Sequence, residues 1–147
     1  MDQLEVIKKI ATLFSSIYKQ IPFSHYWHTL NSLKTPGHTL LDVACGDGQF
    51  MALINSDKKY LVTGVDLFPP YLKKAQATGA YVKLVRADIK KLPFKPKSFD
   101  IVLCSQAIEH LSKDEGFKLM TTLEKIARER VVFITPAGEM PQEPYDG

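Results

Sequence analysis

Three aspartates stand out because each lies at the end of a short run of apolar residues. They are Asp42, Asp66 and Asp88. Apolar runs of this length, rich in β-branched residues, predict buried strands. A carboxylate after a second strand can accept hydrogen bonds from both hydroxyls of a ribose, and one after a third strand can accept from an adenine amino group. The three acids therefore favour a ligand that carries a nucleoside.

A glycine-rich turn, Ala44-Cys45-Gly46-Asp47-Gly48, follows the first of these acids. Gly46 and Gly48 lack the Cβ that would block close approach of a ligand to the backbone, and they can adopt positive φ. The N–H groups at the start of the following helix can meet polar or anionic groups. A glycine turn alone is weak evidence, but beside three strand-end acids it predicts one binding crevice at the carboxyl ends of the strands.

The elements that must position these side chains alternate between strand-like and helix-like segments from His38 onward. Such alternation is typical of repeated βαβ units and of a mainly parallel sheet. We therefore predict a Rossmann-like, doubly wound α/β fold of about five strands in the order 3-2-1-4-5. The predicted strands are Thr39–Val43, Tyr60–Val65, Tyr81–Val85, Phe99–Cys104 and Arg130–Thr135, and the predicted helices are Gly48–Ser56, Pro70–Thr78 and Lys113–Arg128. Between the third and fourth strands, residues 88–98 are expected to form a loop with room for a turn of helix.

Residues 1–36 precede this alternation and are expected to be helical. Asp2 and Glu5 have the spacing of a capping box, and the stretch from Tyr18 to Trp27 is rich in aromatic residues. This segment is expected either to cover the ligand as a lid or to pack on the sheet edge. We divide the chain into this helical segment (1–36), a ligand-binding domain (37–136) and a proline-rich tail (137–147).

The segment from Leu40 to Pro136 resembles the class I S-adenosylmethionine-dependent methyltransferases, particularly the group similar to ubiquinone and menaquinone biosynthesis methyltransferases. The turn after Asp42 matches their first motif, with Ala44 where the family usually has glycine. Asp66 matches the family's ribose-binding acid. Further matching segments are Ala87-Asp88-Ile89, Leu92-Pro93-Phe94, Ser98-Phe99-Asp100-Ile101-Val102 and Ser105–Leu111.

This resemblance implies that the cofactor is S-adenosylmethionine and that its methyl group passes to an unidentified acceptor, expected to be a small molecule. It implies that Asp42 offsets the ammonium of the methionine moiety, while the backbone from Ala44 to Gly46 closes around it. The cofactor-binding residues that it implies are Asp42, Ala44, Cys45, Gly46, Gly48, Asp66, Leu67, Ala87, Asp88, Ile89 and Ser105.

A dedicated catalytic residue is not required by this chemistry. The positive sulfur already activates the methyl group, so the protein's main task is to align a nucleophile and exclude water. If a base takes a proton from the acceptor, the candidates are Glu109 and His110, because a histidine titrates near working pH. The competing interpretation is that these two residues cap or pack a loop.

Two other functions are weighed against methyl transfer. A classical dinucleotide-binding fold also has a glycine turn and an acid after the second strand, but its fingerprint needs a third glycine where this chain has Met51. A module or truncated fragment that binds S-adenosylmethionine without transferring its methyl group remains open. Methyl loss from the cofactor in the presence of an acceptor would distinguish it from an enzyme.

Composition narrows the classes of protein and of binding partner that fit this chain. The chain has 147 residues, of which 45% are hydrophobic and 24% charged, as expected for one globular domain. Its net charge, from 19 Lys and Arg and 16 Asp and Glu, is +3, which is too small to argue for a nucleic-acid partner. The basic stretch from Lys73 to Lys97 could attract an anionic substrate, although such runs are commonly solvated surfaces.

Location and metal binding follow from equally simple features. No apolar run is long enough to span a bilayer and the N-terminus lacks the pattern of a signal peptide, so we expect a cytoplasmic protein without a membrane segment. Cys45 and Cys104 are expected to be free thiols. His25 and His28 have helical spacing but no nearby acid or cysteine partner, so no metal site is assigned.

The sequence offers five strands, whereas the sheet of the resembled family normally has seven. The last twelve residues contain three prolines and make a further strand improbable. An uncovered edge of the fifth strand would invite association. We therefore expect either a truncated piece of a longer methyltransferase that binds cofactor without transferring methyl groups, or self-association through this edge.

Overall fold

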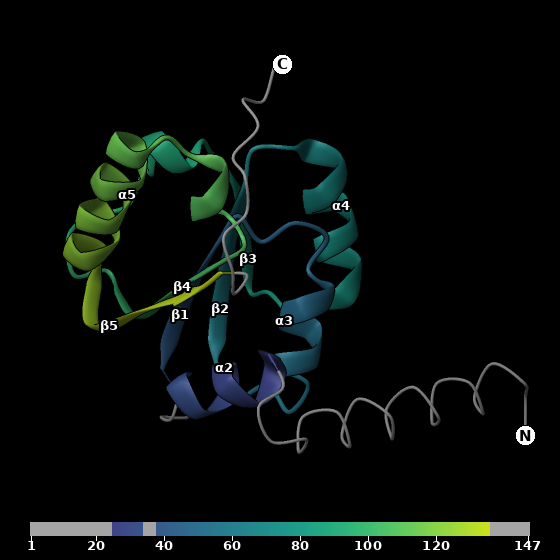
Figure 1. Ribbon diagram of the computed structural model, residues 1–147. Coiled ribbons are helices and arrows are strands. Elements are labelled where there is room, and N and C mark those ends of the chain that lie inside the picture. Colours follow the sequence, from purple (N-terminus) through teal and green to yellow (C-terminus); the bar gives the residue numbers. More distant parts are fainter. Residues whose placement is uncertain (1–24, 34–37, 136–147) are drawn as a thin grey trace, which may run out of the picture.

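A computed structural model describes residues 25–33 and 38–135, which form a five-stranded sheet in the order β3-β2-β1-β4-β5 (Figure 1). All four pairs of neighbouring strands are parallel. The strands are β1 (Thr39–Val43), β2 (Leu61–Asp66), β3 (Lys83–Arg86), β4 (Phe99–Ser105) and β5 (Ala127–Ile134). The predicted Rossmann-like fold and its strand order are confirmed.

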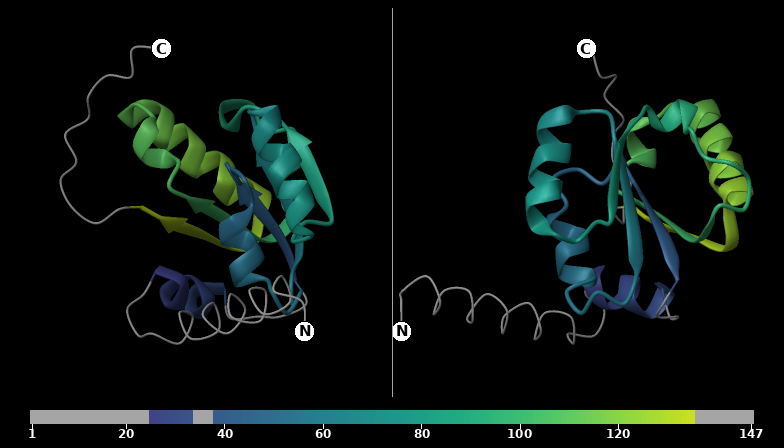
Figure 2. Two further views of the ribbon diagram at one scale, coloured as in Figure 1. Left: turned by 90° about the vertical axis from the view of Figure 1, so that its right-hand side faces the viewer. Right: turned by 180° about the vertical axis from the view of Figure 1, so that it is seen from behind.

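Helices cover both faces of the sheet (Figures 1 and 2). The helices are α2 (His25–Leu33), α3 (Gln49–Ile54), α4 (Pro69–Thr78) and α5 (Lys113–Ile126), with short 3-10 turns η1 (Ile89–Lys91) and η2 (Ile108–His110). Successive residues of β1 alternate between two cores: Leu40 packs with α2 and α3, and Leu41 packs with α5. Both faces of the central strands are therefore buried, which explains their continuous apolar runs.

Helix α4 ends at Thr78 as its sequence predicts and starts one residue before the predicted Pro70. It begins at Pro69, with proline in its first turn, and ends before Gly79, whose φ of 68° is left-handed. The expected turn of helix in the segment after β3 is η1. Helix α5 opens with a capping box between Ser112 and Glu115.

The end of α5 corrects the prediction. The helix stops at Ile126, and β5 begins at once at Ala127, earlier than the predicted strand start at Arg130. Ala127 pairs with Phe99 of β4, and the backbone N–H of Lys97 donates to the Lys125 carbonyl at the helix end. Pairing with β4 and this backbone cap outweigh the local helical pattern.

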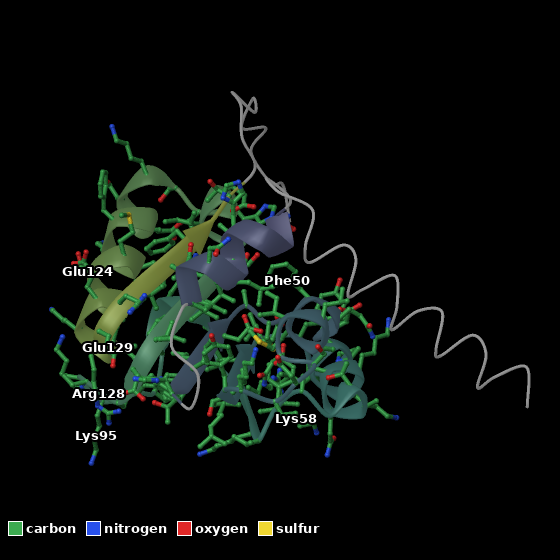
Figure 3. The ribbon with its side chains drawn as sticks, turned by 90° about the horizontal axis from the view of Figure 1, so that it is seen from below. Phe50, Lys58, Lys95, Glu124, Arg128 and Glu129 are labelled. Atoms are coloured by element: carbon green, nitrogen blue, oxygen red, sulfur yellow. The ribbon has the colours of Figure 1, made fainter. Side chains whose placement is uncertain are left out.

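The amino-terminal edge of the sheet is held by a network around Asp100 at the start of β4. Its Oδ2 accepts hydrogen bonds from the backbone N–H and the hydroxyl of Thr39, at 2.9 and 2.7 Å. Its Oδ1 lies 2.8 Å from an Arg128 nitrogen. Figure 3 shows Arg128 and its neighbour Glu129 where β5 begins, well away from Phe50 on α3. This edge therefore links β1, β4 and β5.

Several predictions fall on residues 1–24, 34–37 and 136–147, which lie outside the described residues. These are the first helix, most of the aromatic entry segment and the proline-rich tail. Of the segment 1–36, helix α2 is described, and it packs against α3 and β5. In the described part of the chain, no helix is long and apolar enough to cross a membrane.

Candidate functional site

A cavity of about 670 Å³ lies at the carboxyl ends of β1, β2 and β4. Strand ends, the turn that follows β1, the start of α3 and one side chain of α4 bound it. Its lining residues are Asp42, Ala44, Cys45, Gly46, Asp47, Gln49, Phe50, Asp66, Tyr71, Ser105 and Gln106. This is where the strand order reverses between β1 and β4, the usual ligand site of open α/β sheets.

The turn after β1 contains two glycines with different surroundings. Gly46 has a φ of 56°, and a Cβ added to it would meet nothing within 4 Å, so its backbone faces open space. Gly48 has a φ of 78°, but a Cβ there would lie 2.8 Å from the Tyr81 ring and 2.9 Å from the Ala75 Cα. Gly46 is therefore the one free to meet a ligand, whereas Gly48 is required by packing and does not line the cavity.

Ala44 adopts a left-handed φ of 56° in the same turn. This conformation costs an L-residue roughly 1–2 kcal/mol, which glycine would avoid. The turn is held in this shape by the backbone hydrogen bond from the Cys45 N–H to the Val65 carbonyl, at 3.0 Å. The strain at Ala44 therefore lies directly on the cavity wall.

Asp66 ties the two loops of the cavity together. Its Oδ2 accepts a hydrogen bond from the Gly46 N–H and its Oδ1 accepts one from the Phe68 N–H, both at 2.9 Å. A carboxylate has about four acceptor positions, so these two bonds leave each oxygen able to accept another. The side chain is thus fixed and still able to bind a pair of hydroxyls.

Asp42 is almost fully buried, with 4% of its surface exposed. The Tyr81 hydroxyl donates a hydrogen bond of 2.7 Å to its Oδ2. Burial is the largest influence on the pKa of this carboxyl group; the Tyr81 bond lowers the pKa and the Asp66 charge raises it, and together they set it at about 7. A nearby cation would favour the ionised form, so the site attracts positive charge.

The two cysteines are free and lie near these acids. Burial, followed by the charge of Asp42, raises the pKa of each thiol to about 12. Both groups therefore stay neutral and unreactive at physiological pH. Cys45 forms part of the cavity wall, and Cys104 lies buried in β4.

Besides Gly48, four of the predicted cofactor-binding residues do not line the cavity. Asp88 caps η1, accepting a hydrogen bond of 2.8 Å from the Lys90 N–H. The Ala87 N–H donates to the Asp66 carbonyl, which keeps the ends of β2 and β3 together. Leu67 is 56% exposed at the end of β2, and Ile89 packs partly against the core on the α5 face. Their roles remain predictions.

The two candidate bases lie in η2, after β4. His110 is exposed, whereas Glu109 is half-buried and close enough to Cys104 for its charge to raise the thiol's pKa. Neither residue lines the cavity. Ser105, at the end of β4, does line it.

Residues 41–135 match the family model described as "Methyltransferase domain". This match covers more than half of the chain and runs from within β1 to the end of β5. The chain belongs to the class I S-adenosylmethionine-dependent methyltransferase family. The resemblance predicted from the sequence is therefore confirmed, and the dinucleotide-binding alternative is not supported.

Individual proteins similar to this chain are also named methyltransferases. It is 33% identical over 101 residues to the 2-methyl-6-phytyl-1,4-hydroquinone methyltransferase of Synechocystis sp., covering 65% of this chain and 31% of that protein. It is also 33% identical over 99 residues to the malonyl-[acyl-carrier protein] O-methyltransferase of Legionella pneumophila, covering 63% of this chain and 34% of the relative. The chain thus spans about a third of the length of these curated relatives.

The fold is also shared with solved structures. A SAM-dependent methyltransferase from Aquifex aeolicus superimposes with a TM-score of 0.65 at 18% identity, over 86% of this chain and 72% of that one. At this identity the match shows the fold alone. It supports the same Rossmann-like architecture for the methyltransferase chain.

Sequence reasoning missed several cavity residues of this methyltransferase domain. Gln49 and Phe50 begin α3, and Tyr71 lies in the first turn of α4. Gln106 follows β4 with a left-handed φ of 51°. Their closeness to the predicted motifs was an available signal. Tyr81 gave no such signal, because its bond to Asp42 joins residues that are 39 positions apart.

Proposed function

We propose that this chain binds S-adenosylmethionine in the cavity at the carboxyl ends of β1, β2 and β4 and forms the cofactor-binding part of a methyltransferase. The observation that carries the proposal is the pair of carboxylates, Asp42 and Asp66, on one cavity whose wall at Gly46 is bare backbone. An ammonium group and a ribose are the parts of this cofactor that such groups recognise.

The residues of the cavity fit the parts of the cofactor. The acceptor positions left on Asp66 suit the two ribose hydroxyls, and the open space at Gly46 leaves room for the cofactor beside the turn. Asp42 suits the ammonium of the methionine moiety. Outside the cavity lining, Oδ2 of Asp88, whose Oδ1 caps η1, suits the adenine amino group.

Bound S-adenosylmethionine supplies an activated methyl group for in-line transfer to a nucleophile. The protein's part is to hold the donor in one orientation and to exclude water from the reacting atoms. Ser105 and Gln106 line the cavity at the end of β4, where an acceptor could approach. Glu109 and His110 remain the candidates for removing a proton from it.

We propose a small-molecule acceptor and no nucleic-acid partner. The relatives' names specify different acceptors, a hydroquinone and a malonyl-acyl-carrier protein, so they support the donor site more strongly than any one acceptor. The two free thiols fit a reducing compartment such as the cytoplasm. Self-association through the outer edge of β5 stays a prediction, which analytical ultracentrifugation tests.

Calorimetric titration with S-adenosylhomocysteine tests the proposal. We expect Asp66→Ala to weaken binding at least tenfold, because it removes the acceptors for both ribose hydroxyls. The matched control is Asp57→Ala, an exposed aspartate paired with Lys59 outside the cavity, which should bind like the wild type. Preferential binding of NAD, or equal affinity in Asp66→Ala, would contradict the proposal.

A further inference from the structure

We propose that Tyr81 is a positioning residue of the cofactor site, and that its hydroxyl holds the Asp42 carboxylate in the orientation that receives the ammonium group of the cofactor. The inference rests on the proposed function. It adds a residue from outside the methyltransferase motifs that the sequence identified.

The tyrosine reaches Asp42 across the face of the sheet. Asp42 of β1 is paired in register with Gly64 of β2, so the two residues point to the same face. Tyr81 lies in the link between α4 and β3, beyond β2 from β1. Its side chain must therefore pass over β2 to make the 2.7 Å hydrogen bond with Asp42.

Two glycines make room for this path. A Cβ on Gly64 would lie 2.7 Å from Cε1 of Tyr81, and a Cβ on Gly48 would lie 2.8 Å from its Cε2. The ring is thus enclosed on both edges by backbone, with Ala75 of α4 also close to Gly48. An enclosed ring has little rotational freedom, so its hydroxyl is fixed before any ligand arrives.

The hydrogen bond has a direction that suits this role. A tyrosine hydroxyl in the neutral state donates one proton, and burial raises the pKa of Tyr81 far above its usual value, so it stays neutral. The bond occupies one acceptor position on Oδ2 and leaves the other positions of the carboxylate for the ammonium. It also favours the ionised carboxylate against burial, which is the form that attracts a cation.

The other titratable groups around Asp42 are Asp66, Cys45 and Cys104. The thiols remain neutral over the useful pH range because burial raises the pKa of each to about 12. Asp66 adds a like charge and opposes ionisation of Asp42. Of these neighbours, Tyr81 is the one that lowers the pKa of Asp42, so removing its hydroxyl shifts Asp42 further toward the neutral form.

The test compares Tyr81→Phe with the wild type and with Tyr60→Phe, which alters another buried tyrosine in the loop before β2. Each protein is titrated with S-adenosylhomocysteine and with methylthioadenosine, which lacks the amino acid part. For Tyr81→Phe we expect roughly tenfold weaker binding of S-adenosylhomocysteine and unchanged binding of methylthioadenosine. Tyr60→Phe should bind both like the wild type.

A pH series provides a second readout. Loss of the hydroxyl raises the pKa of Asp42, so the fall in S-adenosylhomocysteine affinity on acidification should begin at higher pH in Tyr81→Phe. An equal loss for both ligands, or no change in affinity and pH profile, would overturn the inference. If the wild type binds neither ligand, the proposed function itself fails, which is a different result.

Discussion

The pKa of an aspartate is shifted in opposite directions at the amino and carboxyl ends of the parallel strands, called here the amino edge and the carboxyl edge of the sheet. At the amino edge, Asp100 receives bonds from Arg128 and from both donors of Thr39, and these lower its pKa to about 2. At the carboxyl edge, burial raises the pKa of Asp42 to about 7, and the nearby charge of Asp66 adds to the shift. The fold supplies donors that stabilise the Asp100 carboxylate, whereas the ionised form of Asp42 would be stabilised by a bound cation.

Left-handed backbone occurs at both ends of the strands: Lys58 and Lys97 lie before β2 and β4, whereas Ala44 and Gln106 follow β1 and β4. Ala44 and Gln106, two non-glycine residues with left-handed φ, both line the cavity at the carboxyl edge. Strain and an unfavourable charge placed together indicate a part of the molecule shaped for a ligand rather than for stability. The contacts of Asp100 at the amino edge stabilise the folded protein. Burial of Asp42 and the left-handed backbone of Ala44 at the carboxyl edge destabilise it.

The largest effect should come from the glycine that is packed at the carboxyl edge. Gly48→Ala forces a Cβ against Tyr81 and Ala75 and places alanine at a φ of 78°, so we expect a loss of about 3–5 kcal/mol in unfolding free energy. Chemical denaturation measures it. The matched control is Gly79→Ala at the end of α4, where φ is 68° but a Cβ meets nothing within 4 Å; its expected loss is about 1–2 kcal/mol. Equal losses would show that packing at Gly48 is unimportant.

Asp42→Asn should stabilise the protein at pH 8. Between about pH 4 and pH 7 the unfolded chain has lost the Asp42 proton while the folded chain retains it, so wild-type stability falls as pH rises through this window. The neutral amide of asparagine avoids the cost of ionising a buried carboxyl group. The expected gain in unfolding free energy is on the order of 2–4 kcal/mol at pH 8, and it vanishes near pH 4. Denaturation at both pH values checks it. A variant that is less stable at pH 8 would contradict the assigned burial cost.

Asp100→Asn should do the reverse, with a smaller effect. The folded pKa of Asp100 lies below the unfolded value, so its contribution is present above about pH 4 and is lost as pH falls toward 2. We expect a loss of about 1–3 kcal/mol at pH 7, from weakened bonds to a charged group, and a shrinking difference on acidification. Asp57→Asn, which breaks an exposed pair with Lys59, is the control and should cost under about 1 kcal/mol. Equal losses of unfolding free energy in the two variants would show that the bonds to Asp100 stabilise the fold no more than an exposed ion pair does.

Much of the fold and part of the site followed from the sequence. Apolar runs and turn residues predicted each strand, and parallel topology then placed Asp42, Gly46 and Asp66 at one edge, because parallel strands end on the same side of a sheet. The start of β5 at Ala127 did not follow. That boundary depends on pairing with Phe99, a contact that no local pattern encodes.

Local sequence determined which side chains close each strand, since that depends only on the order of residues along the chain. The tertiary structure alone decided which of two similar glycines faces the cavity and which accommodates a tyrosine ring. It also decided that Asp42 is buried beside Tyr81, because that contact needs β2 to carry a glycine in register between them. The charge state of a buried carboxylate is set by such neighbours, and they assemble only when distant segments pack together.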